Sequence, residues 1–200
     1  MDDRLLIAIL AAGASRRLGQ PKQLVSVNGE PLLRRQCRIA IEADIAPVAA
    51  ILGCRAEECA ATLTELPVMI RLNSEWEEGI ASSLREAARA AVERSASGLL
   101  ILQADQFQIT AQDLQAIYAA WRESGETKAC RARQDDYAGP PVILPSACFA
   151  AVQQLQGDQG ARSVLSSLGT QAVVEVAMPN ATHDLDSPDQ LRAVSDSIGG

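Results

Sequence analysis

The feature that most constrains the fold is a run of consecutive apolar residues near the N-terminus, Leu5–Leu10. No polar residue interrupts it, and such continuity is typical of a central strand in a parallel sheet, where both faces are buried. Three further segments have the same strand-like character: Pro47–Leu52, Val68–Leu72 and Leu99–Gln103. The first half of the chain therefore predicts a largely parallel sheet.

Helix-like segments lie between these strands. Ser83–Arg94 is amphipathic, because its apolar residues recur on one helical face. Thr110 is expected to cap a helix that extends to about Ser124, with Asp113 in the first turn. Two shorter helices complete the alternation, at Leu32–Ala43 and Ala56–Leu63. Strands separated by such helices indicate βαβ units and therefore an α/β protein.

The pattern is less regular after residue 125. Three strands are expected there, at Lys128–Arg133, Val142–Leu144 and Ala172–Val176. Three helices are expected, at Pro145–Leu155, Ala161–Leu168 and Pro188–Ser197. No repeat, low-complexity stretch or linker divides the chain, and 200 residues are an ordinary length for one domain. We therefore expect a single domain over residues 1–200.

Charge and composition exclude several partners. The chain has 18 basic and 25 acidic residues, a net charge of -7, which disfavours nucleic acid. Its six aromatic residues are too few for a base-stacking platform. The N-terminal apolar run is far shorter than the ~20 residues that cross a bilayer, and it lacks the basic start of a signal peptide. We expect no membrane partner and a cytoplasmic location.

Residues that bind metals or act as nucleophiles are also scarce. The one histidine, His183, rules out a His-rich zinc site, and a Ser-His-Asp triad would have to use it. The five cysteines form no Cys-x-x-Cys pair, so we expect reduced thiols that are mostly buried. The chemistry of this chain should therefore depend on carboxylates, cations and backbone groups.

The most informative segment follows the first strand and extends from Leu10 to Lys22. In open parallel sheets ligands bind at this edge. Gly13 and Gly19 allow backbone conformations in which successive N–H groups point at one anion, while Arg17 and Lys22 add positive charge. The segment could cradle a triphosphate, or it could be a plain strand-to-helix turn with solvated cations. It matches neither the P-loop nor the dinucleotide-binding pattern.

Eight positions here match the pattern Leu-Ala-Ala-Gly-x-Ser-x-Arg-x-Gly-x-x-Lys: Leu10, Ala11, Ala12, Gly13, Ser15, Arg17, Gly19 and Lys22. The pattern resembles the signature of nucleotidyltransferases with the glycosyltransferase-A-like fold. Further segments resemble one branch of them, the molybdenum cofactor cytidylyltransferases: Asn73–Trp76, Gly79–Leu84, Asp105–Gln106, Gly139–Val142, Gly157–Arg162 and Asp184–Pro188. They occur in the branch's order and span about residues 5–195.

The resemblance implies a three-layer α/β/α, Rossmann-like nucleotidyltransferase fold with a mostly parallel sheet. It also implies Mg²⁺-dependent transfer of CMP from CTP to the phosphate of molybdopterin cofactor. The products would be molybdopterin cytosine dinucleotide and pyrophosphate. A molybdenum hydroxylase or its maturation factor is the expected protein partner.

The same resemblance assigns roles to individual residues. Arg17 and Lys22 would be catalytic, and Asp105 and Asp186 would hold Mg²⁺. Arg162 would bind the acceptor. The residues expected to bind the nucleotide are Leu10, Ala11, Ala12, Gly13, Ser15, Asn73, Gly79, Ser82 and Ser83.

Several of these residues have plainer alternative roles. Asp105 could cap the helix that starts near Thr110. Ser82 and Ser83 could cap the helix after Gly79, and Asn73 could stabilise a turn. His183 is expected to be structural or solvent-facing.

Two positions depart from the branch. Ala104 stands where a small residue, often glycine, precedes the aspartate. Phe107 stands where the branch usually has proline, and we expect it to add bulk next to the metal site. Trp76 is expected in the core. Two alternative functions stay open: transfer from GTP or to another phosphate acceptor, and a non-catalytic carrier of the molybdenum cofactor.

Overall fold

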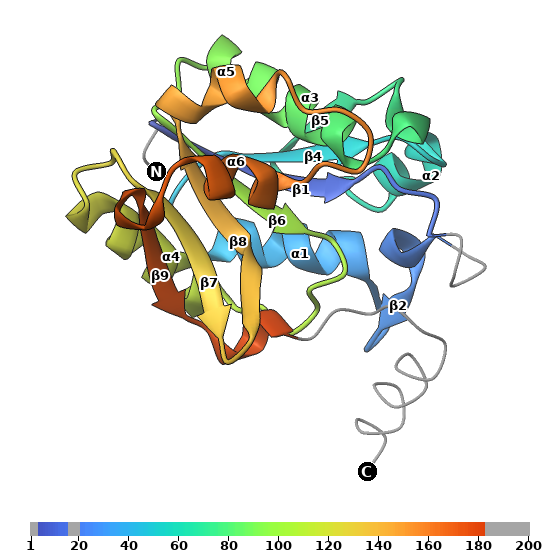
Figure 1. Ribbon diagram of the computed structural model, residues 1–200. Helices are drawn as coiled ribbons and strands as arrows, with labels where there is room; N and C mark the ends of the chain where they lie inside the picture. Colours follow the sequence, from blue (N-terminus) through green and yellow to red (C-terminus); the bar gives the residue numbers. More distant parts are fainter. Residues whose placement is uncertain (1–3, 16–20, 183–200) are drawn as a thin grey trace.

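A seven-stranded sheet forms the centre of the computed structural model, which describes residues 4–15 and 21–182 (Figure 1). Its strand order is β5-β4-β1-β6-β8-β7-β9. Of the strands in this sheet, the first four along the chain are β1 (Leu5–Ala11), β4 (Val48–Leu52), β5 (Val68–Leu72) and β6 (Gly98–Gln103). They pair in parallel, as the apolar runs predict.

The other three strands are β7 (Ala129–Gln134), β8 (Tyr137–Pro145) and β9 (Val173–Ala177). β8 lies between β6 and β7 and is antiparallel to both, whereas β7 and β9 are parallel to each other. Of these seven strands only β8 therefore runs against the rest. The prediction of a mostly parallel sheet is confirmed.

Helices cover both faces of the sheet. One face carries α1 (Leu32–Glu42), α2 (Ala56–Ala61) and α4 (Ala111–Glu123). The other carries α3 (Ile80–Glu93), α5 (Phe149–Val152) and α6 (Ala161–Ser167). Figure 1 shows α3 and α5 on one side of the strands and α1 and α4 on the other. The three-layer prediction is therefore confirmed.

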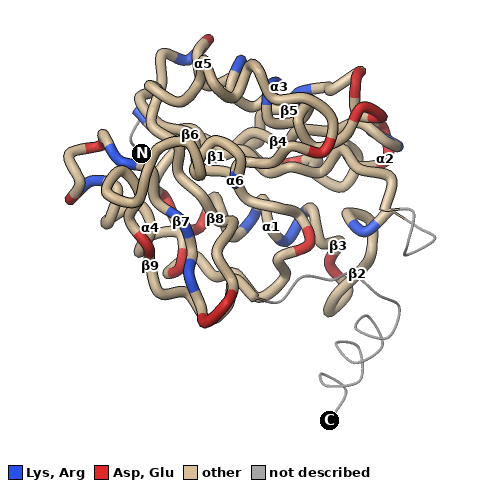
Figure 2. The backbone as a smooth tube through the Cα atoms, viewed as in Figure 1, with Lys and Arg blue, Asp and Glu red and all other residues tan. Residues whose placement is uncertain are grey.

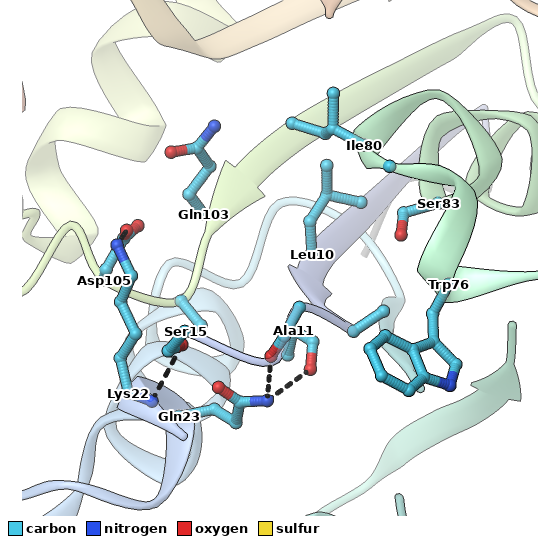
Figure 3. Close-up of a pocket in the computed structure, with 14 residues that line it drawn as sticks. Leu10, Ala11, Ser15, Lys22, Gln23, Trp76, Ile80, Ser83, Gln103 and Asp105 are labelled. Atoms are coloured by element: carbon cyan, nitrogen blue, oxygen red, sulfur yellow. Dashed lines mark hydrogen bonds and ion pairs between the residues drawn. The ribbon is translucent and has the colours of Figure 1, made fainter. Parts of the chain in front are cut away.

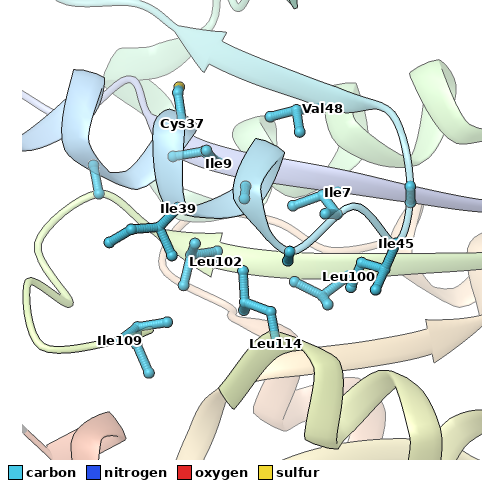
Figure 4. Packing of buried hydrophobic residues seen from close by; sticks show 14 of the residues in the cluster. Ile7, Ile9, Cys37, Ile39, Ile45, Val48, Leu100, Leu102, Ile109 and Leu114 are labelled. Carbon is cyan, nitrogen blue, oxygen red and sulfur yellow. The ribbon is translucent and has the colours of Figure 1, made fainter. Parts of the chain in front are cut away.

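β1 shows why the sheet is buried on both sides. Its odd residues, such as Ile7 and Ile9, pack with α1 and α4 (Figure 4). Its even residues, such as Leu6 and Ala8, pack with α3 in a second core. Successive strand residues point to opposite faces, so a strand that supports two cores has no position for a polar side chain.

A small hairpin was not expected from the sequence. β2 (Ser26–Val27) and β3 (Glu30–Pro31) pair antiparallel around Asn28-Gly29, both of which have positive φ. Asn-Gly is the strongest short hairpin signal, so the sequence did contain a pattern that indicates this hairpin. Five 3₁₀ turns complete the described elements: η2 (Lys22–Leu24), η3 (Trp76–Glu78), η4 (Ser146–Cys148), η5 (Thr170–Ala172) and η6 (Pro179–Thr182).

Some predicted boundaries were wrong. The helix expected from Ser83 begins at Ile80, directly after Gly79. The helix expected over Pro145–Leu155 is only η4 and the one-turn α5, because β8 continues to Pro145. The helix expected over Pro188–Ser197 lies outside the described residues.

Surface charges of opposite sign are mixed. Figure 2 shows Lys and Arg interspersed with Asp and Glu along the chain. Ion pairs account for part of this arrangement; Arg71, for example, contacts both Glu86 and Glu93. Within the described ranges, no helix has the length and apolar character needed to cross a bilayer.

Candidate active site

A first cavity lies at the carboxyl ends of β1 and β6 (Figure 3), the edge at which open α/β sheets bind ligands. Its walls come from the loop after β1, the start of α3 and the segment after β6. The lining residues are Leu10, Ala11, Ala12, Gly13, Ser15, Lys22, Gln23, Trp76, Gly79, Ile80, Ser83, Gln103, Ala104 and Asp105. Most of the residues expected to bind a nucleotide therefore lie together.

Hydrogen bonds from neighbouring residues fix the backbone carbonyls of the loop after β1. Gln23 is buried, and its Nε2 donates to the carbonyls of Ala11 and Gly13 at 3.0 and 2.9 Å. The intervening carbonyl of Ala12 accepts from the backbone N–H of Cys54 at 2.9 Å. Three successive carbonyl oxygens are thus already bonded to the protein. Sequence reasoning missed Gln23, although it directly follows the last position of the motif.

Lys22 and Asp105 form an ion pair at the floor of this cavity. Lys22 Nζ lies 2.6 Å from Asp105 Oδ2, and the two side chains are only 24% and 14% exposed. The backbone N–H of Lys22 also donates to Ser15 Oγ at 3.0 Å. Residues 83 positions apart are therefore brought together at the edge shared by β1 and β6.

Asp105 fits the requirements of a Mg²⁺ ligand. It is a carboxylate on a sheet edge, and a cation, the Lys22 ammonium, already contacts one of its oxygens. Mg²⁺ usually takes one or two protein carboxylates and fills its other positions with phosphate oxygens and water. Among the described residues no group of three acidic, His or Cys side chains could hold a metal. The second expected ligand, Asp186, lies outside the described residues, as do Arg17 and His183.

The alternative role for Asp105 is wrong. Helix α4 is capped by Thr110, whose hydroxyl accepts from the backbone N–H of Asp113 while Asp113 returns a bond to Thr110. Asp105 is therefore not needed as a cap. The predicted start of this helix and the place of Asp113 in it are confirmed.

The wall opposite Asp105 is formed by Trp76, Gly79, Ile80 and Ser83. Trp76 was expected in the core, but it is half-buried and faces the cavity (Figure 3). Gly53 permits this position, because a Cβ there would lie 2.5 Å from Trp76 Cβ and 2.9 Å from Ala12 Cβ. The indole therefore packs directly against the chain beside the β1 loop.

Asn73 and Ser82 lie behind this wall rather than on it. Asn73 Nδ2 donates to Ser82 Oγ at 2.8 Å and to Ser83 Oγ at 3.0 Å, while its Oδ1 accepts from the backbone of Glu75. Ser82 Oγ in turn donates to the carbonyl of Gly79 at 2.8 Å. The structure thus favours the turn role for Asn73 and a supporting role for Ser82, and leaves Ser83 on the cavity.

A second cavity adjoins the first. It is lined by Leu10, Ile80, Leu84, Ile101, Gln103, Tyr137, Ala138, Gly139, Pro140, Val142, Gly160, Ala161, Arg162 and Leu165. Leu10, Ile80 and Gln103 line both cavities. Arg162 is exposed here and is a cation on an otherwise mostly apolar surface. It therefore lies across the shared wall from the Lys22–Asp105 pair.

Gln106 anchors the segment after β6 through buried hydrogen bonds. Its fully buried side-chain amide donates from Nε2 to the carbonyl of Pro140 at 2.7 Å, and the backbone carbonyl of Gln106 accepts from Gln36 Nε2 at 2.7 Å. Nε2 also lies 3.3 Å from Tyr137 Oη. The segment carrying Asp105 is thereby fixed to α1 on one side and to β8 on the other.

The expectation for Phe107 was wrong. Phe107 packs against Val25, Val27 and Leu32 beside the β2–β3 hairpin, so its ring does not line the first cavity. Its carbonyl accepts from Arg35 Nε at 3.1 Å. The hairpin that the sequence reading missed is what receives this side chain.

A loop after α5 is fastened to the wall of the first cavity. Glu78 accepts from Arg85 at 2.7 Å and from the backbone N–H of Gly157 at 3.0 Å. These bonds lower the pKa of Glu78 to about 2, with the Arg85 bond the larger cause. Arg85 also donates to the carbonyl of Leu155 at 2.8 Å. The start of the Gly157–Arg162 segment is therefore positioned by the turn that carries Trp76.

No cysteine lines either cavity. All five are free thiols, as predicted. Burial raises the pKa of Cys37 and of Cys130 to about 12, so these thiols stay protonated and unreactive at neutral pH.

Fold and site together define a class. A mostly parallel three-layer sheet carries a cation–carboxylate pair and a backbone loop at its carboxyl edge, as in nucleotidyltransferases. Residues 7–173 match the MobA-like NTP transferase domain, and the chain belongs to that family. The resemblance read from the motifs is thereby confirmed at the level of the family.

Three relatives show how far the similarity extends. The purine catabolism protein PucB of Bacillus subtilis (strain 168) is 29% identical over 95% of both chains. A probable molybdenum cofactor guanylyltransferase of Synechococcus elongatus is 66% identical over 32 residues, 16% of each chain. The structure of Rv0371c from Mycobacterium tuberculosis H37Rv has a TM-score of 0.81 and 27% identity, covering 96% of this chain and 98% of that one. A complex of Rv0371c with manganese has a TM-score of 0.78.

Proposed function

We propose that residues 1–200 form one nucleotidyltransferase domain that transfers a nucleotidyl group from a triphosphate in the first cavity to a phosphorylated acceptor in the second. The observation that carries this proposal is the wall that the two cavities share at Leu10, Ile80 and Gln103. Group transfer needs two substrates whose reacting atoms meet in a fixed geometry. Two cavities with a common boundary, and with cations in each, suit two anionic substrates.

The acceptor we propose is molybdopterin carrying molybdenum, and the donor is CTP, so that the product is molybdopterin cytosine dinucleotide. Membership of the MobA-like family and the order of the six motif segments support this choice. The guanylyltransferase among the relatives supports the molybdenum cofactor but favours a different base. A GTP-dependent reaction therefore remains the main alternative.

The reaction places few demands on proton transfer. An oxygen of the acceptor phosphate attacks the α-phosphorus, the bond to the β-phosphate breaks, and pyrophosphate leaves. The acceptor phosphate is already ionised at neutral pH, so no general base is required. In this scheme Lys22 stabilises negative charge on the departing phosphates, and Arg162 holds the anionic acceptor. Arg17 is proposed as a second catalytic cation on the sequence motif.

Asp105 is the residue that would hold Mg²⁺, with Asp186 as the proposed second ligand. When bound, the ion would neutralise phosphate charge and polarise the α-phosphate. The manganese complex of Rv0371c supports a divalent ion in this family. In this scheme the ammonium of Lys22, which contacts Asp105, would contact the phosphates when the nucleotide is bound.

The lining of the first cavity is our reason for proposing a pyrimidine. Trp76 and Ser83 line it together with Ala11 and Ala12, and Gly53 lets the indole approach closely. We expect a base held between these residues to be the smaller kind. Calorimetry with CTP, GTP, ATP and UTP at equal Mg²⁺ tests the base: we expect the lowest Kd for CTP, and equal or tighter GTP binding would overturn the cytosine assignment.

Pyrophosphate release tests the enzyme against the carrier. With CTP, Mg²⁺ and molybdopterin cofactor, an enzyme releases pyrophosphate with each product formed. A non-catalytic carrier would bind the cofactor and release none. Omission of the cofactor is the control, because it separates transfer from simple hydrolysis of CTP.

The cellular setting is also part of the proposal. Five free cysteines agree with a reducing compartment, which for this protein would be the cytoplasm. A molybdenum hydroxylase, or its maturation factor, would then receive the dinucleotide product.

A further inference from the structure

Gln103 occupies a distinctive place between the two cavities. It is the last residue of β6 and pairs with Leu10 of β1. Among the described residues, three side chains line both cavities, and the other two, Leu10 and Ile80, are apolar. Gln103 is therefore the one polar side chain that the described parts of the two cavities share.

The backbone of Gln103 is fixed, while its side chain has no hydrogen-bond partner within residues 4–15 and 21–182. Its N–H donates to Gln106 Oε1 at 3.3 Å, and its carbonyl accepts from the N–H of Gln106 at 3.4 Å. The side-chain amide, by contrast, makes no hydrogen bond to any described residue. Figure 3 shows it directed away from the Lys22–Asp105 pair. A half-buried amide that no described residue bonds can offer its donors to a ligand.

The position of Gln103 between the two cavities determines which part of a ligand its side chain would contact. In a transfer reaction the reacting atoms of donor and acceptor lie where the two binding sites join. We propose that the side-chain N–H of Gln103 donates to an oxygen of the reacting phosphates, on either the α-phosphate or the attacking acceptor phosphate. This inference rests on the proposed function and adds a catalytic residue to it.

A neutral donor suits this place better than a cation. The acceptor phosphate must keep enough electron density on its attacking oxygen to act as a nucleophile. An ammonium or guanidinium would bind that oxygen strongly and lower its reactivity, whereas an amide orients it with a weaker bond. The charged side chains, Lys22 and Arg162, line separate cavities on the two sides of the junction.

The test compares Gln103→Leu and Gln103→Glu with the unchanged protein. Leu removes the donor, and we expect kcat for pyrophosphate release to fall about 10- to 100-fold with little change in KM for the nucleotide. Glu places a carboxylate among phosphates, so we expect a larger fall in kcat and weaker nucleotide binding by calorimetry. Neither variant should lower Tm much, because the side chain bonds no described residue.

Gln112→Leu and Gln112→Glu are matched controls, since Gln112 is exposed on α4 and lines neither cavity. They should leave kcat and nucleotide binding unchanged. If Gln103→Leu turns over like the unchanged protein, the inference fails and the proposed function stands. If both Gln103 variants lose activity only in proportion to a lower Tm, the residue is structural and the inference also fails. If the unchanged protein neither binds a nucleotide nor releases pyrophosphate, the proposed function fails and the inference fails with it.

Discussion

The two sides of this molecule are built differently. The side that carries the first cavity consists of parallel strands β5, β4, β1 and β6, of which β4, β1 and β6 are buried and the edge strand β5 is partly exposed. The side that carries much of the second cavity depends on β8, an antiparallel strand inserted between β6 and β7. The first side presents partly buried charges, Lys22 and Asp105, and the second presents the exposed Arg162.

The two sides also differ in how firmly their loops are held. On the first side the β1 loop is held by buried Gln23, and the Asp105 segment is held by Gln106. On the second side the start of the Gly157–Arg162 segment depends on exposed Glu78 and on the backbone around Gly79. We therefore expect changes on the first side to affect chemistry more than stability, and changes at the connection between the sides to affect both.

The largest effect is expected from Asp105→Ala. If Asp105 holds the metal in the first cavity, its loss should lower the rate of pyrophosphate release by at least about 10³-fold. The measurement is kcat at saturating Mg²⁺. Asp113→Ala is a matched control on the neighbouring helix: it removes a capping bond, costs stability of about 1 kcal/mol, and should leave turnover intact. Normal turnover in Asp105→Ala would remove the first cavity from the reaction.

A smaller effect is expected from Lys22→Met: triphosphate should bind more weakly, whereas manganese should bind more tightly. Loss of a charge-assisted contact should weaken triphosphate binding by about 1.5–3 kcal/mol, roughly 10- to 100-fold. Manganese alone should bind more tightly, because the carboxylate of Asp105 is no longer paired with the ammonium. Calorimetry measures both. Lys128, the other lysine of the chain, is exposed, and Lys128→Met should change neither affinity.

The affinity of Lys22→Met for manganese discriminates between two roles for Lys22. If manganese binds no better to Lys22→Met, the ion pair does not compete with the metal, and Asp105 and Lys22 act independently. Lys22 is only 24% exposed and is paired with Asp105, so its loss should also cause a modest loss of Tm.

The connection between the sides can be broken at Gly79. Its φ is +126°, and an added Cβ would lie 2.5 Å from the carbonyl oxygen of Gly157 and 2.7 Å from Asp158 Oδ1. Gly79→Ala should therefore destabilise the protein by about 1–3 kcal/mol and raise KM for the acceptor. Gly125→Ala is the control, because Gly125 also has positive φ but no atom within 4 Å. Equal losses of Tm in both variants would mean that backbone strain, and not the contact with Gly157, explains the effect.

The same division explains what could be predicted from the sequence. β1 and β6 were predicted because strands buried on both faces are continuously apolar, and α4 was predicted from the Thr110–Asp113 cap. These are local signals. The antiparallel placement of β8 was not foreseen, because it depends on pairing with Leu99–Ile101 of β6, more than 40 residues away.

Site residues followed a similar rule. The loop after β1 and Asp105 were found because a motif and a strand end mark them. Gln106 was recognised as part of the Asp105–Gln106 motif, but neither it nor Gln23 or Gln103 was given a role, because the role of a glutamine depends on which groups surround it in space. The positions of Asn73 and Ser82 behind the wall likewise depend on their mutual hydrogen bonds, which no linear pattern reveals.

The smallest effect is expected from Glu78→Gln, and it should depend on pH. Arg85 and the N–H of Gly157 hold the pKa of Glu78 at about 2, below its ordinary value of 4.5. The ionised carboxylate therefore stabilises the fold fully above pH 4.5, and this contribution is lost as the pH falls from 4.5 towards 2. The difference in Tm between the unchanged protein and Glu78→Gln should be constant near neutral pH and shrink across that window. Because Glu78 is exposed, added salt should reduce the difference as well.

Glu77→Gln is the matched control, since Glu77 is exposed on the same short turn. Its effect on Tm should be small at every pH. If the Tm difference for Glu78→Gln instead grows as the pH falls below 4.5, the carboxylate is not held in its ionised form, and the loop at Gly157 must be positioned by other contacts. The steric contact at Gly79 would then be the main connection between the two sides, and Gly79→Ala should show nearly the whole effect on acceptor binding by itself.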